Sequence, residues 1–169
     1  MSYTQLNGQP QGYPYYFTNK IREALIAEIF AINGYAGHLA NSNMEDINAV
    51  WRSIIQDEKD HYGMFLTLIR KYDPVQHQQY LEHVHQKIIV TPLPAYKPDC
   101  NKQLILNNVR DDIKGELEAV ILYEQHLAEM PYQDIRNVFY TVIKAEKGHT
   151  EQLTRLLLKY DPDKYNDLT

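Results

Sequence analysis

The sequence predicts an all-α protein, an antiparallel four-helix bundle built from two duplicated helical hairpins with one long crossover. Residues 19–74 align with residues 107–162 at an offset of 88 without a gap, and 20 of the 56 aligned positions are identical. Each copy holds two long segments whose apolar residues recur with helical spacing. Short connections join the segments within a copy, whereas about 29 residues separate the copies.

The first copy predicts a helical hairpin. Its first helix covers about residues 18–40, with Thr18 as the N-cap, and its second helix begins after Asn43. Asp46, three residues further on, completes a weaker analogue of a capping box. The second helix ends near Tyr72, because the residue before a proline resists the helical conformation. A connection of about three residues makes the two helices antiparallel.

The second copy predicts an equivalent hairpin, with helices over about residues 102–129 and 132–160, separated at Pro131. Both copies close with the run Lys-Tyr-Asp-Pro, at 71–74 and 159–162. The crossover between them holds four prolines, and a short helix is predicted for 75–85. We therefore expect a flexible Tyr/Gln-rich arm over residues 1–17, the bundle over 18–162 and a tail over 163–169.

Composition excludes several classes of protein. With 17 Lys and Arg against 22 Asp and Glu, the net charge of −5 argues against a nucleic-acid partner. No apolar run is long enough to span a membrane, and the first residues lack the features of a secretory signal. The single cysteine, Cys100, excludes an internal disulfide and a four-cysteine metal site. A cytoplasmic location is the simplest expectation.

Acidic and imidazole side chains interrupt the apolar stripe of each predicted helix near its middle. Residues four and seven apart share a helix face, and this spacing places the interruptions on the inward face. The first helix of each copy contributes one glutamate, and the second contributes a Glu-x-x-His pair. The six residues are Glu28, Glu58, His61, Glu116, Glu146 and His149. The repeat also separates Glu116 from its neighbour Glu118, because Glu118 aligns with Phe30.

Charge balance explains how six such groups share one core. Burying a lone carboxylate costs several kcal/mol, and four together would repel each other and take up protons. Two divalent cations would neutralise four carboxylates, and the neutral imidazoles would complete the coordination. Two Glu-x-x-His motifs paired with lone glutamates are the signature of di-iron or di-manganese carboxylate sites. The sequence therefore predicts two bound iron ions, with manganese as the alternative.

With these motifs the chain resembles the ferritin-like di-iron carboxylate superfamily, and within it the rubrerythrin-type proteins, over about residues 19–162. The resemblance implies that Glu58 and Glu146 bridge the metals and that Glu28 and Glu116 are terminal ligands. It implies one metal each for His61 and His149. A tyrosine two turns after the first glutamate lies near the metals in that family, and Tyr35 and, through the repeat, Tyr123 match it as tentative catalytic residues.

The chain departs from the family pattern in three places. It holds no four-cysteine rubredoxin-like segment, so the resemblance implies an external electron-donor protein. The additional glutamate that rubrerythrins carry three residues after the lone one is replaced by Ala119, which puts their metal shift in doubt. The six-ligand set is closer to that of bacterioferritin, yet the haem-binding methionine of bacterioferritin is Lys59 here.

Several other polar residues lie outside this set of six, and for most of them we expect no direct role in metal binding. Asp112, one turn before Glu116, either orients a ligand histidine or is a polar residue near the end of the bundle. For His38 and His126 we expect capping or a contact to a ligand. Surface positions are expected for His77, His83, His85, Glu23, Glu118, Asp57 and Asp60.

The sequence thus favours a di-iron oxidoreductase that reduces H₂O₂ or O₂ with electrons from an external donor. One alternative is a substrate hydroxylase, which needs an apolar channel to the metals. Another is a manganese catalase, which needs no reductant. The third is an iron-storage or structural coat protein, which predicts a large assembly. A homodimer is the default expectation, since isologous pairs are the commonest oligomers.

Overall fold

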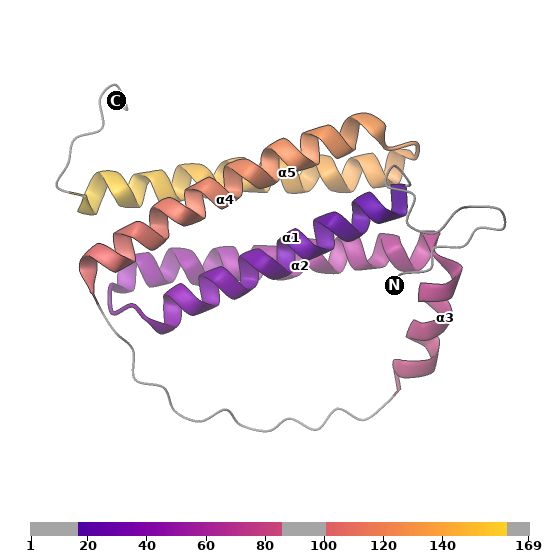
Figure 1. The fold of residues 1–169 in the computed structure, drawn as a ribbon, viewed down its shortest axis with the longest axis horizontal. Coiled ribbons are helices and arrows are strands. Elements are labelled where there is room, and N and C mark those ends of the chain that lie inside the picture. Colours follow the sequence, from indigo (N-terminus) through magenta and orange to yellow (C-terminus); the bar gives the residue numbers. More distant parts are fainter. Residues whose placement is uncertain (1–16, 86–100, 162–169) are drawn as a thin grey trace.

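The computed structural model describes residues 17–85 and 101–161. Within these ranges all regular elements are helices, namely α1 (Phe17–Ala40), α2 (Glu45–Tyr72), α3 (Pro74–His83), α4 (Lys102–Glu129) and α5 (Gln133–Tyr160). α1 pairs with α2 and α4 pairs with α5 as two antiparallel hairpins, which lie side by side (Figure 1). The predicted all-α bundle of two hairpins is confirmed, and α3 is the short helix expected in the crossover.

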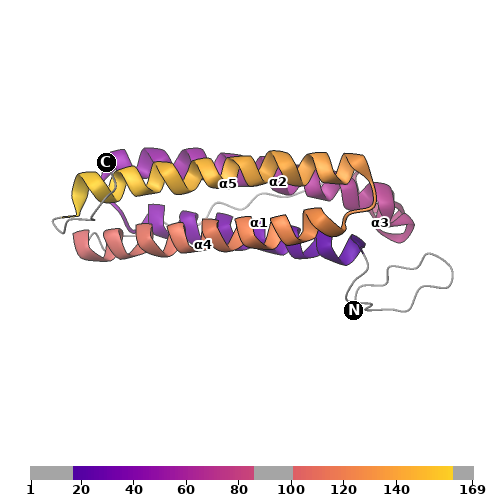
Figure 2. The same ribbon diagram turned by 90° about the horizontal axis from the view of Figure 1, so that it is seen from above.

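The four long helices form two layers. Seen from above, α1 and α4 make one layer and α2 and α5 make the other (Figure 2). The two hairpins contact each other through α1 with α4 and through α2 with α5, and these contacts are less extensive than those within a hairpin. α3 lies beside the bundle and packs against α2.

The core is divided into two apolar clusters that the repeat relates to each other. One cluster contains Phe65, Phe139 and Ile135, and the other contains Trp51 and Ile47, all fully buried. Because Trp51 aligns with Phe139 and Ile47 with Ile135, each half of the chain supplies equivalent positions to opposite clusters. The carboxylate layer lies on the same inward stripes of the helices, between the apolar positions of the two clusters.

The start of α1 differs from the prediction. Thr18 was predicted as the N-cap, but α1 begins at Phe17 and Thr18 is a buried residue of its first turn. The Phe17 ring lies edge-on to Tyr72 and Tyr132, with centroids 5.5 and 5.4 Å away. This aromatic contact at the end of the bundle accounts for the earlier start, because it holds the first residue of the helix against α2 and against the start of the neighbouring hairpin's α5.

The start of α2 also differs from the prediction. Its N-cap is Met44 rather than Asn43, and no side chain caps it. Asp46, which was predicted to complete a capping box, accepts hydrogen bonds from Lys159 Nζ and Tyr160 OH at the end of α5. Contacts between the hairpins therefore replace the local cap.

The repeated Lys-Tyr-Asp-Pro run closes the bundle at both ends. Lys71 Nζ and Tyr72 OH each lie 2.7 Å from a carboxylate oxygen of Asp134, at the start of α5. Asp134 is the repeat equivalent of Asp46, so the lysine and tyrosine of each copy hold the other hairpin.

The aspartate of the same run closes its own hairpin. Asp73 is buried and pairs with Arg22 of α1, while its other oxygen accepts from the first backbone N–H groups of α3. In the second copy Asp161 pairs with Arg110 of α4. In each hairpin, this ion pair holds the beginning of the first helix next to the end of the second helix.

Some sequence predictions lie outside the described residues. They concern residues 1–16 of the arm that was predicted over 1–17, the tail over 163–169 and the crossover segment 86–100 with Cys100. Phe17, the last residue of the predicted arm, belongs to α1. Among the described residues, none of the helices has the length and apolarity that crossing a membrane requires.

Asp73→Ala should lower the free energy of unfolding by about 3 kcal/mol, because it removes a buried carboxylate from beside Arg22 and the cap from α3. Chemical denaturation followed by circular dichroism measures the change. Glu124→Ala, which removes an exposed pair with Lys147, is the control and should cost less than about 1 kcal/mol. Equal losses in the two variants would contradict the structural role of Asp73.

Candidate metal centre

The structure brings all six predicted ligands together in the middle of the bundle. α1 supplies Glu28 and α4 supplies Glu116, while the Glu-x-x-His pairs come from α2 and α5. Each of the six is at most 4% exposed. The helical spacing explains this placement, since a glutamate and a histidine three residues apart project from one face.

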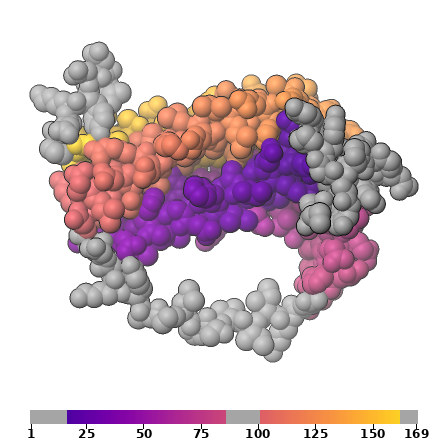
Figure 3. All heavy atoms as spheres, in the orientation of Figure 1, coloured from indigo at the N-terminus to yellow at the C-terminus, as the bar shows by residue number. Residues whose placement is uncertain are grey.

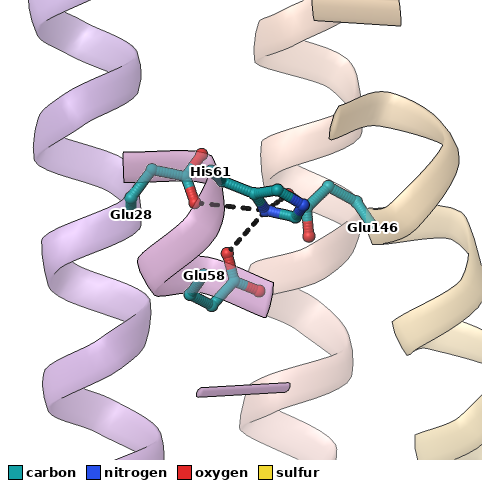
Figure 4. Close-up of side chains that lie close together, drawn as sticks. All are labelled: Glu28, Glu58, His61 and Glu146. Carbon is teal, nitrogen blue, oxygen red and sulfur yellow. Dashed lines mark hydrogen bonds and ion pairs between the residues drawn. The ribbon is translucent and has the colours of Figure 1, made fainter. Parts of the chain in front are cut away.

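The first group of ligand atoms surrounds His61 (Figure 4). Its Nδ1 lies 3.2 Å from Glu58 Oε2, 3.4 Å from Glu146 Oε1 and 3.5 Å from Glu28 Oε2. Each of the four residues offers a ligand atom within 4.8 Å of the others. Three helices therefore converge on one position.

The second group surrounds His149 in the same way. Its Nδ1 lies 3.1 Å from Glu146 Oε2, 3.2 Å from Glu58 Oε1 and 3.3 Å from Glu116 Oε2. The His61 and His149 rings lie 6.1 Å apart. Glu58 and Glu146 belong to both groups, so the two positions share a pair of carboxylates.

The hydrogen bonding within the site leaves acceptors unsatisfied. One imidazole N–H can serve one carboxylate, yet each Nδ1 faces three. With all four glutamates ionised, Glu28 Oε2 and Glu58 Oε1 are buried and have no hydrogen-bond donor within the described part of the chain. Buried polar atoms without a partner are costly. Two divalent cations at these positions would satisfy the free oxygens, so the residues fit a di-metal centre.

The environment divides the four carboxylates into two kinds. Burial raises the pKa of Glu28 to about 8 and that of Glu116 to about 9, so both are protonated near neutral pH. Burial also disfavours the ionised forms of Glu58 and Glu146, but hydrogen bonds from the histidines outweigh it and lower both pKa values. The shared carboxylates are therefore the ionised ones.

The two histidines carry the balancing charge. Burial disfavours the imidazolium form, but hydrogen bonds to the surrounding glutamates outweigh it and raise the pKa of His61 and of His149 to about 12. The metal-free cluster then holds two carboxylates and two imidazolium ions, a net charge of zero. Two divalent cations with four carboxylates and two neutral imidazoles also sum to zero. Metal binding thus exchanges four protons for two cations.

The two tyrosines bind carboxylates across the bundle. Tyr35 of α1 donates to Glu116 Oε1 of α4, and Tyr123 of α4 donates to Glu28 Oε1 of α1, the latter at 2.7 Å. Burial, reinforced by the nearby carboxylates, raises the pKa of both phenols, which keeps them protonated as donors. Each tyrosine therefore orients the lone glutamate of the other hairpin.

Sequence reasoning missed Asp57. It was predicted to be a surface residue, and its side chain is 48% exposed, yet its Oδ2 lies 3.3 Å from His149 Nε2. A carboxylate on one ring nitrogen leaves the other nitrogen as the metal-binding one. The repeat hides this role, because Ala145 aligns with Asp57. The only sequence signal is an aspartate directly before the Glu-x-x-His motif of the first copy.

Asp112 does not orient a ligand histidine, so that interpretation is wrong. Its Oδ2 accepts from Trp51 Nε1 at 2.8 Å, and His38 Nδ1 lies 3.0 Å from its Oδ1. Trp51 is a fully buried core residue that also satisfies this buried carboxylate. The aligned residues of the other half are Ala24 and Phe139, so the aspartate and its tryptophan donor are replaced together.

The remaining predicted surface residues divide into two groups. Glu23 is half-exposed, but its Oε2 lies 3.0 Å from Nε2 of the buried His126, so it is not simply solvated. The exposed positions expected from the sequence are observed for Asp60, His77, His83, His85 and Glu118. Glu118 pairs with Lys114 on the surface and does not join the cluster.

Metal affinity should rise with pH, because the raised pKa values of Glu28, Glu116 and the histidines mean that protons compete with the metal. Near pH 7 we expect about four protons released for every two ions bound. Calorimetric titration with Zn²⁺ in buffers of different ionisation enthalpy gives this number. Glu116→Gln should release about one proton fewer. Affinity that falls as pH rises would contradict the charge exchange.

Comparisons with known proteins agree with this architecture. A stretch of 71 residues is 34% identical to the encapsulin nanocompartment cargo protein EncC of Myxococcus xanthus, covering 42% of this chain and 55% of that protein. The chain thus matches about half the length of this relative. A two-domain protein with DJ-1/ThiJ/PfpI-like and ferritin-like domains from Anabaena variabilis superposes with a TM-score of 0.68 at 11% identity, over 89% of this chain and 41% of that one.

A hypothetical protein of Pyrococcus furiosus superposes with a TM-score of 0.62 at 18% identity, over 92% of this chain and 97% of that one. At such identities the two structures support the fold alone. The family evidence is the match of the rubrerythrin family model to residues 19–157, which include all six clustered side chains. The chain therefore belongs to the rubrerythrin family.

Proposed function

We propose that the protein is a di-iron oxidoreductase that reduces peroxide or dioxygen with electrons from an external donor protein. The observation that carries this proposal is the pair of four-residue groups that share Glu58 and Glu146 in the buried middle of the bundle. Membership of the rubrerythrin family supports the same chemical class.

Each residue has a role that follows from its position. Glu58 and Glu146 would hold both metals, Glu28 with His61 would complete one position, and Glu116 with His149 would complete the other. Carboxylate and imidazole donors without thiolates suit iron, with manganese as the alternative. When bound, the metal pair would supply the redox chemistry.

The surrounding side chains fix the geometry of the site. Tyr35 and Tyr123 donate to the lone glutamates and hold their orientation. Asp57 holds the His149 ring so that Nδ1 faces the shared carboxylates. The apolar clusters on either side keep the site in a low-dielectric environment, where fixed charges act strongly.

A second candidate is iron oxidation for storage within a protein shell. It is supported by the similarity to a protein named as an encapsulin nanocompartment cargo. Light scattering of the purified protein separates a large assembly from the homodimer expected from the sequence. The homodimer, the donor protein and the cytoplasmic location stay predictions.

We expect about two metal ions per chain in protein grown with both iron and manganese, measured by elemental analysis. Glu58→Ala and Glu146→Ala should each lose most of the metal, because each carboxylate serves both positions. Glu118→Ala is the matched control on the neighbouring α4 surface and should keep its metal. Equal losses in all three variants would show that the cluster is not the metal site.

Peroxide consumption by the metal-loaded protein should continue only while a reductant is supplied, since two electrons are used for each peroxide. Absorbance of H₂O₂ with and without reductant gives the two rates. Sustained turnover without reductant would favour the manganese catalase alternative. A protein that consumes neither peroxide nor oxygen at full metal content would refute the proposed activity.

A further inference from the structure

A cavity of about 550 Å³ lies between α1 and α4 and reaches the candidate metal centre. At its inner end are the carboxylates of Glu28, Glu58, Glu116 and Glu146. At its outer end the exposed side chains include Phe30, which is 79% exposed. Figure 3 shows the face on which it opens, with α1 in indigo beside α4 in coral and orange. The centre is therefore accessible from this layer of the bundle.

Small residues create this space. α1 places Ala31 and Gly34 on the cavity wall, and α4 places Gly115 and Ala119 opposite. A Cβ atom built on Gly34 or Gly115 would meet no atom within 4 Å, so the hollow continues up to the backbone. α2 and α5 differ, because they supply most of the buried apolar residues of the two clusters.

The cavity is much larger than hydrogen peroxide or dioxygen requires. A water molecule occupies roughly 30 Å³ in the liquid, and these oxidants are of similar size. Pockets of about 300–1,000 Å³, with apolar walls and a few polar groups, are typical of larger organic ligands. Here Ile26, Ala27, Phe30 and Leu122 provide apolar walls, and the four clustered carboxylates lie at the inner end. The lining also includes the exposed acidic residues Glu23, Asp111 and Glu118.

We propose that this cavity binds an organic hydroperoxide, with its apolar part against the α1–α4 walls and its –OOH group at the carboxylate layer. The proposal deepens the peroxide reduction proposed above and rests on it. The O–O bond breaks, the substrate R–O–O–H takes up two electrons and two protons, and R–OH and water leave. The external reductant supplies the electrons, and solvent supplies the protons.

The walls and the inner end of the cavity have separate functions in this proposal. Ile26, Phe30 and Leu122 contact the apolar part and decide which R groups bind. The carboxylate layer is common to every peroxide, whatever its R group. A change on the wall should therefore alter the choice between peroxides without altering the metal centre.

Gly34→Leu tests binding directly, because its side chain enters the hollow from a position where a Cβ atom meets no atom within 4 Å. Leucine also has the higher helix propensity, so the variant should fold, and thermal melting checks this. Gly37→Leu is the matched control, since Gly37 is one turn away on α1 and lies outside the cavity lining. Gly115→Leu fills the cavity from the opposite wall.

The probe is 2-phenylpropan-2-ol, the neutral alcohol formed from cumene hydroperoxide, added to the Zn²⁺-loaded full chain. Its dissociation constant is measured by ligand-observed NMR. Gly34→Leu and Gly115→Leu should each weaken binding about tenfold or more, and Gly37→Leu should match the wild type. Absence of binding to the wild type, including closure of this face by a second copy, would overturn the proposal. Equal binding to wild type and Gly34→Leu would do the same.

Turnover separates this proposal from the proposed function. In iron-loaded protein with a reductant, Gly34→Leu should lower kcat/KM for cumene hydroperoxide about tenfold more than it lowers kcat/KM for the smaller H₂O₂. If no variant consumes either peroxide while the alcohol still binds to the cavity, the proposed function fails and the binding site stands. If the two peroxides are affected equally, the proposed substrate class is wrong.

Discussion

The fold depends on charge balance in an apolar interior. Four glutamates and two histidines occupy one layer, and each of them is almost completely buried. Ionised groups without compensation could not remain there. In the metal-free protein the balance is reached by protons, because two glutamates are neutral and two histidines are charged. Cations would replace those protons without changing the total charge, so metal binding would preserve the charge balance of the interior.

The two copies contribute equally to the layer of glutamates and histidines, since each hairpin provides one half of the ligand set. Neither half is sufficient, because each group of ligand atoms combines residues from both hairpins. The repeated closing run works in the same way: its lysine and tyrosine bind the other hairpin, while its aspartate binds its own. The hairpins are thus held in register at both ends and at the centre, which fixes the distances between their carboxylates.

The two halves have diverged where symmetry is not required. Asp57 contacts His149, but Ala145 occupies the equivalent position of the second copy, so only one of the two histidines has this contact. Comparison of the two copies identified the six residues, because all six recur at the offset of 88. The structure confirms that they meet in the core. Asp57 was expected on the surface because it faces away from the apolar stripe, and the repeat gave no reason to revise this, since Ala145 occupies the equivalent position. Comparing the two copies cannot identify a contact that a residue makes in only one of them.

The sequence by itself determined the helices, their pairing into hairpins and the inward position of the glutamates and histidines. These follow from the spacing of residues along one helix, which is fixed by 3.6 residues per turn. Only the tertiary structure decided that Tyr35 binds Glu116 and Tyr123 binds Glu28, and that a cavity separates α1 from α4 beside the carboxylates. Those features depend on how closely two helices from different hairpins approach each other, and helical periodicity contains no information about that distance.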